Sequence, residues 1–167
     1  MPSFLNRADL PRGIRNNNPG NLIQTNIQWQ GKVPNPTDSR FEQFYDVVYG
    51  LRALLLDLRT DTQRYNGNVR QIIAEFAPAF ENNTASYQNN IVSMIGSETV
   101  RACREDLIKL AKAIVIIENG QQYAPLIDNR WYEMAADKTE LPKCSQIPKQ
   151  DNSAIIKAAA LFLLSQL

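Results

Sequence analysis

The sequence of 167 residues contains no histidine and only two cysteines. The absence of histidine excludes the usual zinc site, the Ser-His-Asp triad and the Cys-His pair. Any hydrolytic chemistry must therefore depend on carboxylates, or on unusual serine, lysine or tyrosine arrangements. Cys103 and Cys144 lack the CxxC spacing, and they either pair in an oxidising compartment or remain free thiols. We expect no metal site and no cofactor.

The chain also lacks an excess of charge of either sign, because 18 basic residues offset 17 acidic ones. A net charge of +1 favours neither nucleic acid nor an anionic membrane as the principal partner. No run approaches the roughly 18 apolar residues of a membrane span. The N-terminal residues 1–15 contain no apolar core of a secretory signal. If the protein works outside the cytoplasm, we expect something else to deliver it.

What is present is typical of one globular domain, with 44% hydrophobic and 21% charged residues. We expect residues 1–137 to form this domain. Residues 138–167 are expected to add a loop and a C-terminal apolar helix, "SAIIKAAALFLLSQL", packed on the same domain. The alternative for that helix is docking to a partner or a membrane surface.

Helical periodicity dominates after residue 46. Apolar residues recur at i, i+3, i+4 and i+7 in 47–64, and similar patterns predict helices in 69–76, 104–118 and 125–136 and a helix within 81–96 that follows capping residues. Before residue 46, "LIQTNIQWQGKV" and "SRFEQFYD" alternate apolar and polar residues across the loop "PNPTDS", which predicts a small β-hairpin. The expected fold is mainly α, with a small β element near the N-terminus (α+β).

Glu118 is the first candidate for chemistry, because it ends an apolar helix in "IVIIENG". The negative end of the helix dipole and the branched residues before Glu118 both favour the protonated acid, which is what a general acid needs. Asn119 and Gly120 supply the left-handed residue that ends the helix. The alternative interpretation is an ordinary solvent-exposed helix end.

Two further segments carry polar side chains at notable positions. In "ENNTASY", Glu81 precedes a helix and Tyr87 lies one turn inside it. These residues are either a favourable first-turn acid and a core tyrosine, or a carboxylate and a hydroxyl that face a cleft. In "RNNNPGN", Asn17, Asn18 and Asn21 either shape a turn or donate hydrogen bonds to N-acetyl groups.

Asp38, in the predicted hairpin region, is the remaining candidate carboxylate. It is either a turn residue or a second acid that faces the cleft.

These motifs, taken in order, resemble a family of small phage and prophage proteins, the virion structural protein P5-like proteins, with a lysozyme-like lytic domain. The resemblance covers about residues 12–136, and "RGIRNNNPGN" is its most specific part. Relatives typically carry histidine where this chain has Ile117. The matching segments are "RGIRNNNPGNL", "WQG", "FEQF", "GLRALLLDL", "FAPAFENNTASY" and "AIVIIENGQQY". A weaker similarity to lytic transglycosylases lies in "IVIIENG" and "ENNTASY", in reversed order, which a circularly permuted lysozyme-like fold would reconcile.

The resemblance implies cleavage of peptidoglycan between N-acetylmuramic acid and N-acetylglucosamine by a lytic transglycosylase or muramidase, with Glu118 as general acid and base. Glu81 or Asp38 would assist in hydrolysis. Substrate would be bound by Tyr87, Asn17, Asn18, Asn21 and Tyr123.

The expected setting is the bacterial periplasm or cell wall, reached through a virion, lysis or a secretion system. We expect a monomer that acts on glycan strands, with a virion, delivery-system or immunity protein as a further partner. The alternatives are a non-catalytic virion or wall-binding protein with the same fold, and a delivered antibacterial toxin with the same chemistry.

Overall fold

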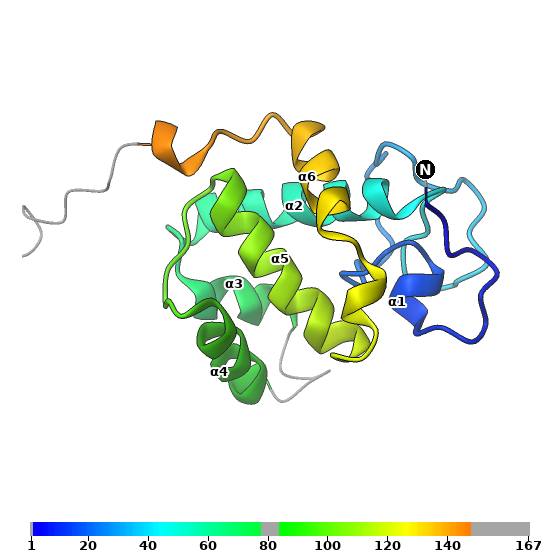
Figure 1. Cartoon of the computed structure of the whole chain (residues 1–167), viewed down its shortest axis with the longest axis horizontal. Coiled ribbons are helices and arrows are strands. Elements are labelled where there is room, and N and C mark those ends of the chain that lie inside the picture. The colour runs from blue at the N-terminus through cyan, green and yellow to red at the C-terminus, as the bar shows by residue number, and fades with distance from the viewer. Residues whose placement is uncertain (1, 78–83, 148–167) are drawn as a thin grey trace, which may run out of the picture.

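The computed structural model describes residues 2–77 and 84–147, and it is mainly helical (Figure 1). In this part of the chain no helix is long and apolar enough to cross a membrane. The helices are α1 (Arg12–Arg15), α2 (Val47–Arg64), α3 (Val69–Phe76), α4 (Thr84–Ile95), α5 (Arg104–Asn119) and α6 (Asn129–Asp137), with the short 3-10 helices η1 (Ala124–Leu126) and η2 (Cys144–Gln146).

Helix α5 lies at the centre of the fold and runs diagonally across the view in Figure 1. It contacts α1, α2, α4 and α6. Its apolar face is fully buried, as the periodicity predicts, and consists of Leu107, Leu110, Ala111 and Ile114. Each fully buried leucine or isoleucine stabilises the fold by roughly 2 kcal/mol. The end of α5 that carries Glu118 is therefore held by the core of the domain.

Helix α2 packs beside α5 and carries the second large part of the core. The side chain of Asp46 begins the helix by accepting a hydrogen bond from the backbone N–H of Val48, at 2.9 Å. Gly50 allows α2 to approach the N-terminal loop, because a Cβ there would lie 1.8 Å from the carbonyl oxygen of Asn17. The predicted face is fully buried and consists of Leu51, Leu54, Leu55 and Leu58.

The N-terminal third is irregular and lies at one end of the helices, on the right of Figure 1. The predicted β-hairpin is not seen in the described part of the chain, and only isolated antiparallel bridges join its two segments, at Ile23–Phe41 and Lys32–Phe44. The side chain of Glu42 explains the difference, since it is fully buried and accepts a hydrogen bond from the backbone N–H of Thr25 at 3.0 Å. A side chain thus takes a donor that a β-ladder would use.

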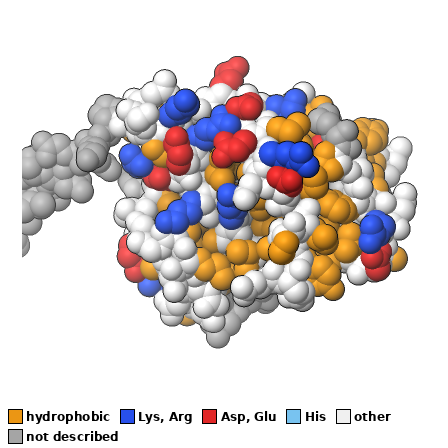
Figure 2. Space-filling model, viewed as in Figure 1, with side chains coloured by type: hydrophobic (Ala, Val, Ile, Leu, Met, Phe, Trp, Pro, Cys, Tyr) orange, Lys and Arg blue, Asp and Glu red, His pale blue; other side chains and the backbone are white. Residues whose placement is uncertain are grey.

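The region around η1 and α6 also differs in detail from the periodicity, which predicts one helix over 125–136. Asp128 separates η1 from α6, and its side chain accepts a hydrogen bond from the backbone N–H of Arg130 at 2.9 Å. Helix α6 is joined to α5 by an ion pair between Arg104 and Glu133 at 2.7 Å. Figure 2 shows basic and acidic side chains interspersed over one half of this face, and hydrophobic side chains grouped over the other.

A disulfide between Cys103 and Cys144 ties the segment after α6 to the start of α5, with the two Cα atoms 5.0 Å apart. The structure thereby selects the paired alternative for the two cysteines. Beyond Cys144 the structure describes the chain as far as residue 147. The apolar helix expected in 153–167 lies outside the described residues.

Candidate functional site

Three segments that are far apart in the sequence meet at the carboxylate of Glu118, in the last turn of α5. The hydroxyl of Tyr87, from α4, donates a hydrogen bond to Oε1 at 2.8 Å. The side-chain amide of Asn21, from the N-terminal loop, donates to Oε2 at 2.8 Å. Within the described residues each oxygen thus has one donor. Glu118 is also partly exposed, so the group stays open to solvent. Both donors are neutral, and they orient the carboxyl group without neutralising its charge.

Tyr87 is almost entirely buried, with 6% of its surface exposed. Burial raises the pKa of its hydroxyl well above the ordinary value, and the charge of Glu118 and the hydrogen bond to it raise that pKa further. The hydroxyl therefore keeps its proton at physiological pH and acts as a permanent donor to Glu118. Tyr87 is thus a buried tyrosine whose hydroxyl contacts Glu118, and its expected role in substrate binding stays a prediction.

The backbone of Asn21 is left-handed, with φ at 51°, which asparagine tolerates better than most residues. Its backbone N–H donates to the carbonyl of Asn18 at 2.8 Å. Gly13 in α1 lies against the side chains of Asn119 and Asn21. A Cβ at this position would lie 2.5 Å from the side-chain oxygen of Asn119 and 2.8 Å from that of Asn21. A glycine in α1 thus lets the Asn21 loop close against the end of α5.

Asn17 and Asn18 are fully buried, and their side chains bond to the protein itself. The amide of Asn17 donates to the carbonyl of Phe44 at 2.9 Å, and that of Asn18 donates to the carbonyl of Leu22 at 2.9 Å. Both amides thus have partners within the protein, and the expectation that these residues bind substrate stays a prediction. They act as internal supports of the loop that presents Asn21.

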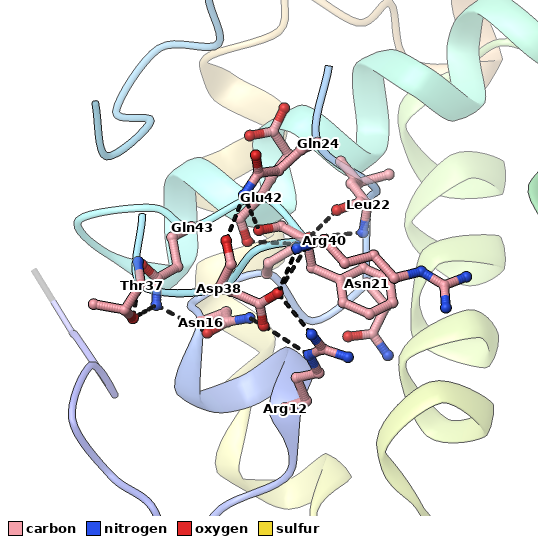
Figure 3. A network of polar contacts seen from close by, with 12 residues as sticks. Arg12, Asn16, Asn21, Leu22, Gln24, Thr37, Asp38, Arg40, Glu42 and Gln43 are labelled. Carbon is pink, nitrogen blue, oxygen red and sulfur yellow. Dashed lines mark hydrogen bonds and ion pairs between the residues drawn. The ribbon is translucent and has the colours of Figure 1, made fainter. Parts of the chain in front are cut away.

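Asp38 is also held by partners within the protein. Its side chain is 7% exposed and forms a bidentate ion pair with the guanidinium of Arg12 (Figure 3). The Nε and Nη2 atoms of Arg12 lie 2.6 and 2.7 Å from the two carboxylate oxygens. It also accepts from the side chain of Asn16 and from the backbone N–H of Arg40 and Phe41. The guanidinium and these donors hold the pKa of Asp38 far below its usual range. A carboxylate engaged in this way is stabilised in its ionised form and held by the protein itself, and the catalytic role expected for Asp38 stays a prediction.

The roles of the other two predicted residues, Glu81 and Tyr123, also stay predictions. Glu81 lies outside the described residues. Tyr123 precedes η1, five residues after Glu118, and it is partly buried against the hydrophobic core.

A groove of about 400 Å³, with Asn21 among its lining residues, lies between the N-terminal loop, α2 and α3. Its lining includes Trp29 and three carboxyl groups, from Asp57, Asp61 and Glu75. Burial raises the pKa of Asp57 to about 6, the charges of Asp61 and Glu75 add to this effect, and Arg64 opposes it.

None of these residues was singled out from the sequence. The available signal was the spacing of Asp57, Asp61 and Arg64 along one face of α2, which is equally typical of a solvent-exposed face.

One group of metal-ligand atoms occurs in the described part of the chain. The sulfur atoms of Cys103 and Cys144 and the carboxylate of Asp106 lie within 4.8 Å of one another. Both sulfurs are joined in the disulfide and offer no thiolate, so these residues do not suit a metal ion.

Comparison with known proteins relates the chain to a bacteriophage protein. It is 33% identical over 125 residues to Protein P5 of Pseudoalteromonas phage PM2, a match that covers 72% of this chain and 77% of that protein. No protein-family model matches the chain.

Proposed function

The chain belongs to the family of bacteriophage protein P5, and we propose that it is a peptidoglycan-cleaving glycosidase with Glu118 as its general acid and base. The bond cleaved is that between N-acetylmuramic acid and N-acetylglucosamine. The observation that carries the proposal is the pair of neutral donors, Tyr87 and Asn21, on the two oxygens of a partly exposed glutamate at the end of a buried helix. Oriented carboxyl groups of this kind are what glycosidic bond cleavage requires.

In the proposed reaction, protonated Glu118 gives its proton to the glycosidic oxygen as the bond from that oxygen to the anomeric carbon breaks. The substrate's own N-acetyl group stabilises the positive charge that develops at the anomeric carbon. Glu118, now a carboxylate, then removes a proton from the attacking hydroxyl. This hydroxyl belongs to the same sugar in a transglycosylase and to water in a hydrolase. Tyr87 and Asn21 hold the carboxyl group in one orientation throughout.

This route needs no second carboxylate, which agrees with the ion-paired state of Asp38. We also propose that the fold is a circularly permuted lysozyme-like domain. The support is the contact of α4 with α5, which brings the tyrosine of the "ENNTASY" motif to the glutamate of the "IVIIENG" motif although their order is reversed. A phage origin of the family is consistent with delivery to the cell wall by a virion or a lysis system.

Purified cell walls incubated with the protein test the proposal through the fragments they release. Fragments with anhydro ends identify a transglycosylase, and fragments with reducing ends identify a hydrolase. Glu118→Gln should reduce release by about 10²–10⁴-fold, whereas Glu98→Gln, a matched change at an exposed glutamate paired with Arg70, should leave it unchanged. Undiminished release by the Glu118→Gln variant would overturn the assignment.

The second candidate is a wall-binding or virion protein that keeps the site without cleavage. The full engagement of Asp38 favours it, because a hydrolase with two carboxylates would need that group free. Binding of the wild-type chain to pelleted walls without release of any fragment would select this candidate. A delivered antibacterial toxin would give the same fragments as the glycosidase, and it differs by needing an immunity protein that blocks release.

A further inference from the structure

The groove with Asn21 in its lining has a wall of carboxyl groups that the proposed cleavage does not use. Its lining residues from the helices include Asp57 and Asp61 of α2 and Glu75 of α3. Among the described residues that line it, only Arg64 is basic. The groove is therefore acidic, and its ligand should carry positive rather than negative charge.

The three carboxyl groups differ in how far the protein already satisfies them. Glu75 accepts from the hydroxyl of Tyr65 at 3.0 Å and from Arg64 at 3.3 Å. Asp61 is 6% exposed and has a long contact of 3.7 Å with Arg64. Asp57 has no hydrogen bond or ion pair with any described residue. Two buried or half-buried carboxyl groups thus remain short of donors, and a cationic donor entering the groove would satisfy both.

The rest of the lining suits a sugar ring. Trp29 and Phe76 provide aromatic surface, and Ile23 and Ile27, both nearly half exposed, provide apolar surface beside it. Aromatic side chains bind both the apolar faces of sugars and cationic groups, tryptophan most strongly. A volume of about 400 Å³ lies within the range of small-ligand sites.

We propose that this groove binds a glucosamine unit that has lost its N-acetyl group, with the free ammonium directed to Asp57 and Asp61. Asn21 lines the groove and also bonds Glu118, so a glycan strand that reaches Glu118 would pass beside the groove. The identity of the strand rests on the proposed function. The preference for an ammonium rests on the groove alone. An acetylated unit lacks the cation, and the carboxylate of a muramic acid unit would be repelled.

Binding should weaken in acid. The charged groups that face Asp57 are Asp61 and Arg64 on its own helix and Glu75 on α3, and the lining residues from the N-terminal loop carry no charge. Because the pKa of Asp57 is raised to about 6, this carboxyl group is ionised at pH 7.5 and largely protonated at pH 5. The amine of a glucosamine unit is only partly protonated at pH 7.5 and becomes fully protonated as the pH falls, so a preference that decreases at pH 5 reports the loss of charge on the carboxyl groups of the protein.

The experiment measures binding of a glucosamine tetramer and an N-acetylglucosamine tetramer to the full chain carrying Glu118→Gln, which prevents cleavage. We expect the glucosamine tetramer to bind at least tenfold more tightly at pH 7.5, and this preference to decrease at pH 5. Asp57→Asn should remove the preference, whereas Asp9→Asn, at an exposed aspartate paired with Arg7, should retain it. Asp61→Asn provides a second groove variant if Asp57→Asn fails to fold.

Equal affinity for the two tetramers, or a preference that survives both groove substitutions, would overturn the inference. Cadaverine, a simple diamine, separates the sugar from the cation. If it binds as tightly as the glucosamine tetramer, the assignment to a sugar is wrong. Failure of the proposed cleavage is distinguishable, because the tetramer preference is measured without turnover and would persist in a chain that releases no wall fragments.

Discussion

Glu118 and Asp38 are both carboxylates held by hydrogen bonds, but their surroundings differ in charge. Glu118 receives its bonds from two neutral donors, Tyr87 and Asn21, and it remains partly exposed. Asp38 faces the guanidinium of Arg12 and lies 7% exposed within a network of donors (Figure 3). Neutral donors orient a carboxyl group and leave its charge available, whereas an arginine locks it in the ionised form. The first arrangement suits proton transfer, and the second suits structure.

The largest expected difference between the two carboxylates is in activity. Glu118→Gln should reduce the release of wall fragments by about 10²–10⁴-fold, the usual contribution of a general acid. Asp38→Asn should leave the rate nearly unchanged at temperatures where the variant is folded. Rates of release from purified walls at 20 °C measure both. A loss of similar size in the two variants would show that the distinction between them is wrong.

The next difference concerns stability, for which we expect the substitution at Asp38 to have a larger effect than the one at Glu118. Asp38→Asn should lower the free energy of unfolding by about 2 kcal/mol, because Arg12 and several donors lose a charged partner; the partial exposure of Arg12 keeps the loss below that of a fully buried pair. Urea unfolding followed by circular dichroism measures this loss. Asp9→Asn, which removes an exposed partner of Arg7, is the matched control and should cause no measurable change.

A smaller effect is expected from removing one donor to Glu118. Tyr87→Phe should reduce activity by about tenfold, equivalent to about 1.4 kcal/mol, because a net hydrogen bond to a charged group is worth about that much. Asn21→Ala should act in the same direction through the other oxygen. The double variant should lose more activity than either single variant. If Tyr87→Phe lowers only the melting temperature and leaves the rate unchanged, the hydroxyl has a purely structural role.

The smallest effect is the pH dependence of the contribution of Asp38 to stability. Because Arg12 depresses the folded-state pKa of Asp38, this contribution is fully present above the unfolded-state pKa of about 4 and is lost as the pH falls below it. The pKa of Asp57 is raised to about 6, so Asp57 has the opposite sign and its cost to stability disappears on acidification. The difference in unfolding free energy between the wild type and Asp38→Asn cancels the Asp57 term. That difference should be constant from pH 7 to pH 5 and should shrink below pH 4.

Periodicity and capping predicted the helices well because burial in α2 and α5 follows the 3.6-residue repeat. Leu51 and Leu107 lie on faces that the sequence alone identifies, and both are fully buried. The predicted hairpin is not seen, because the alternation of apolar and polar residues does not reveal which polar side chains are buried. Glu42 looks like the polar position of a strand, yet its side chain is buried beside Lys32 and takes a backbone donor from the facing segment.

The candidate site was predictable only in part. Glu118 and Tyr87 stand out locally, one at the end of an apolar run and the other in the first turns of a helix. The partnership of Arg12 with Asp38 spans 26 residues and has no local signature. The sequence does not single out Asp57, because charged residues at i and i+4 on a helix usually face solvent. In the structure, Asp57 and Asp61 instead line a groove together with the N-terminal loop and α3.

The sequence by itself determined the helical character of the chain, the absence of histidine and the prominence of Glu118, because each follows from residue type or local spacing. Only the tertiary structure decided which partners surround each described carboxylate. Whether an acid is neutralised, oriented or left without a partner depends on side chains that come from up to 97 residues away, as Asn21 does for Glu118. Those distances are set by packing of the core, which the sequence specifies only through the whole fold.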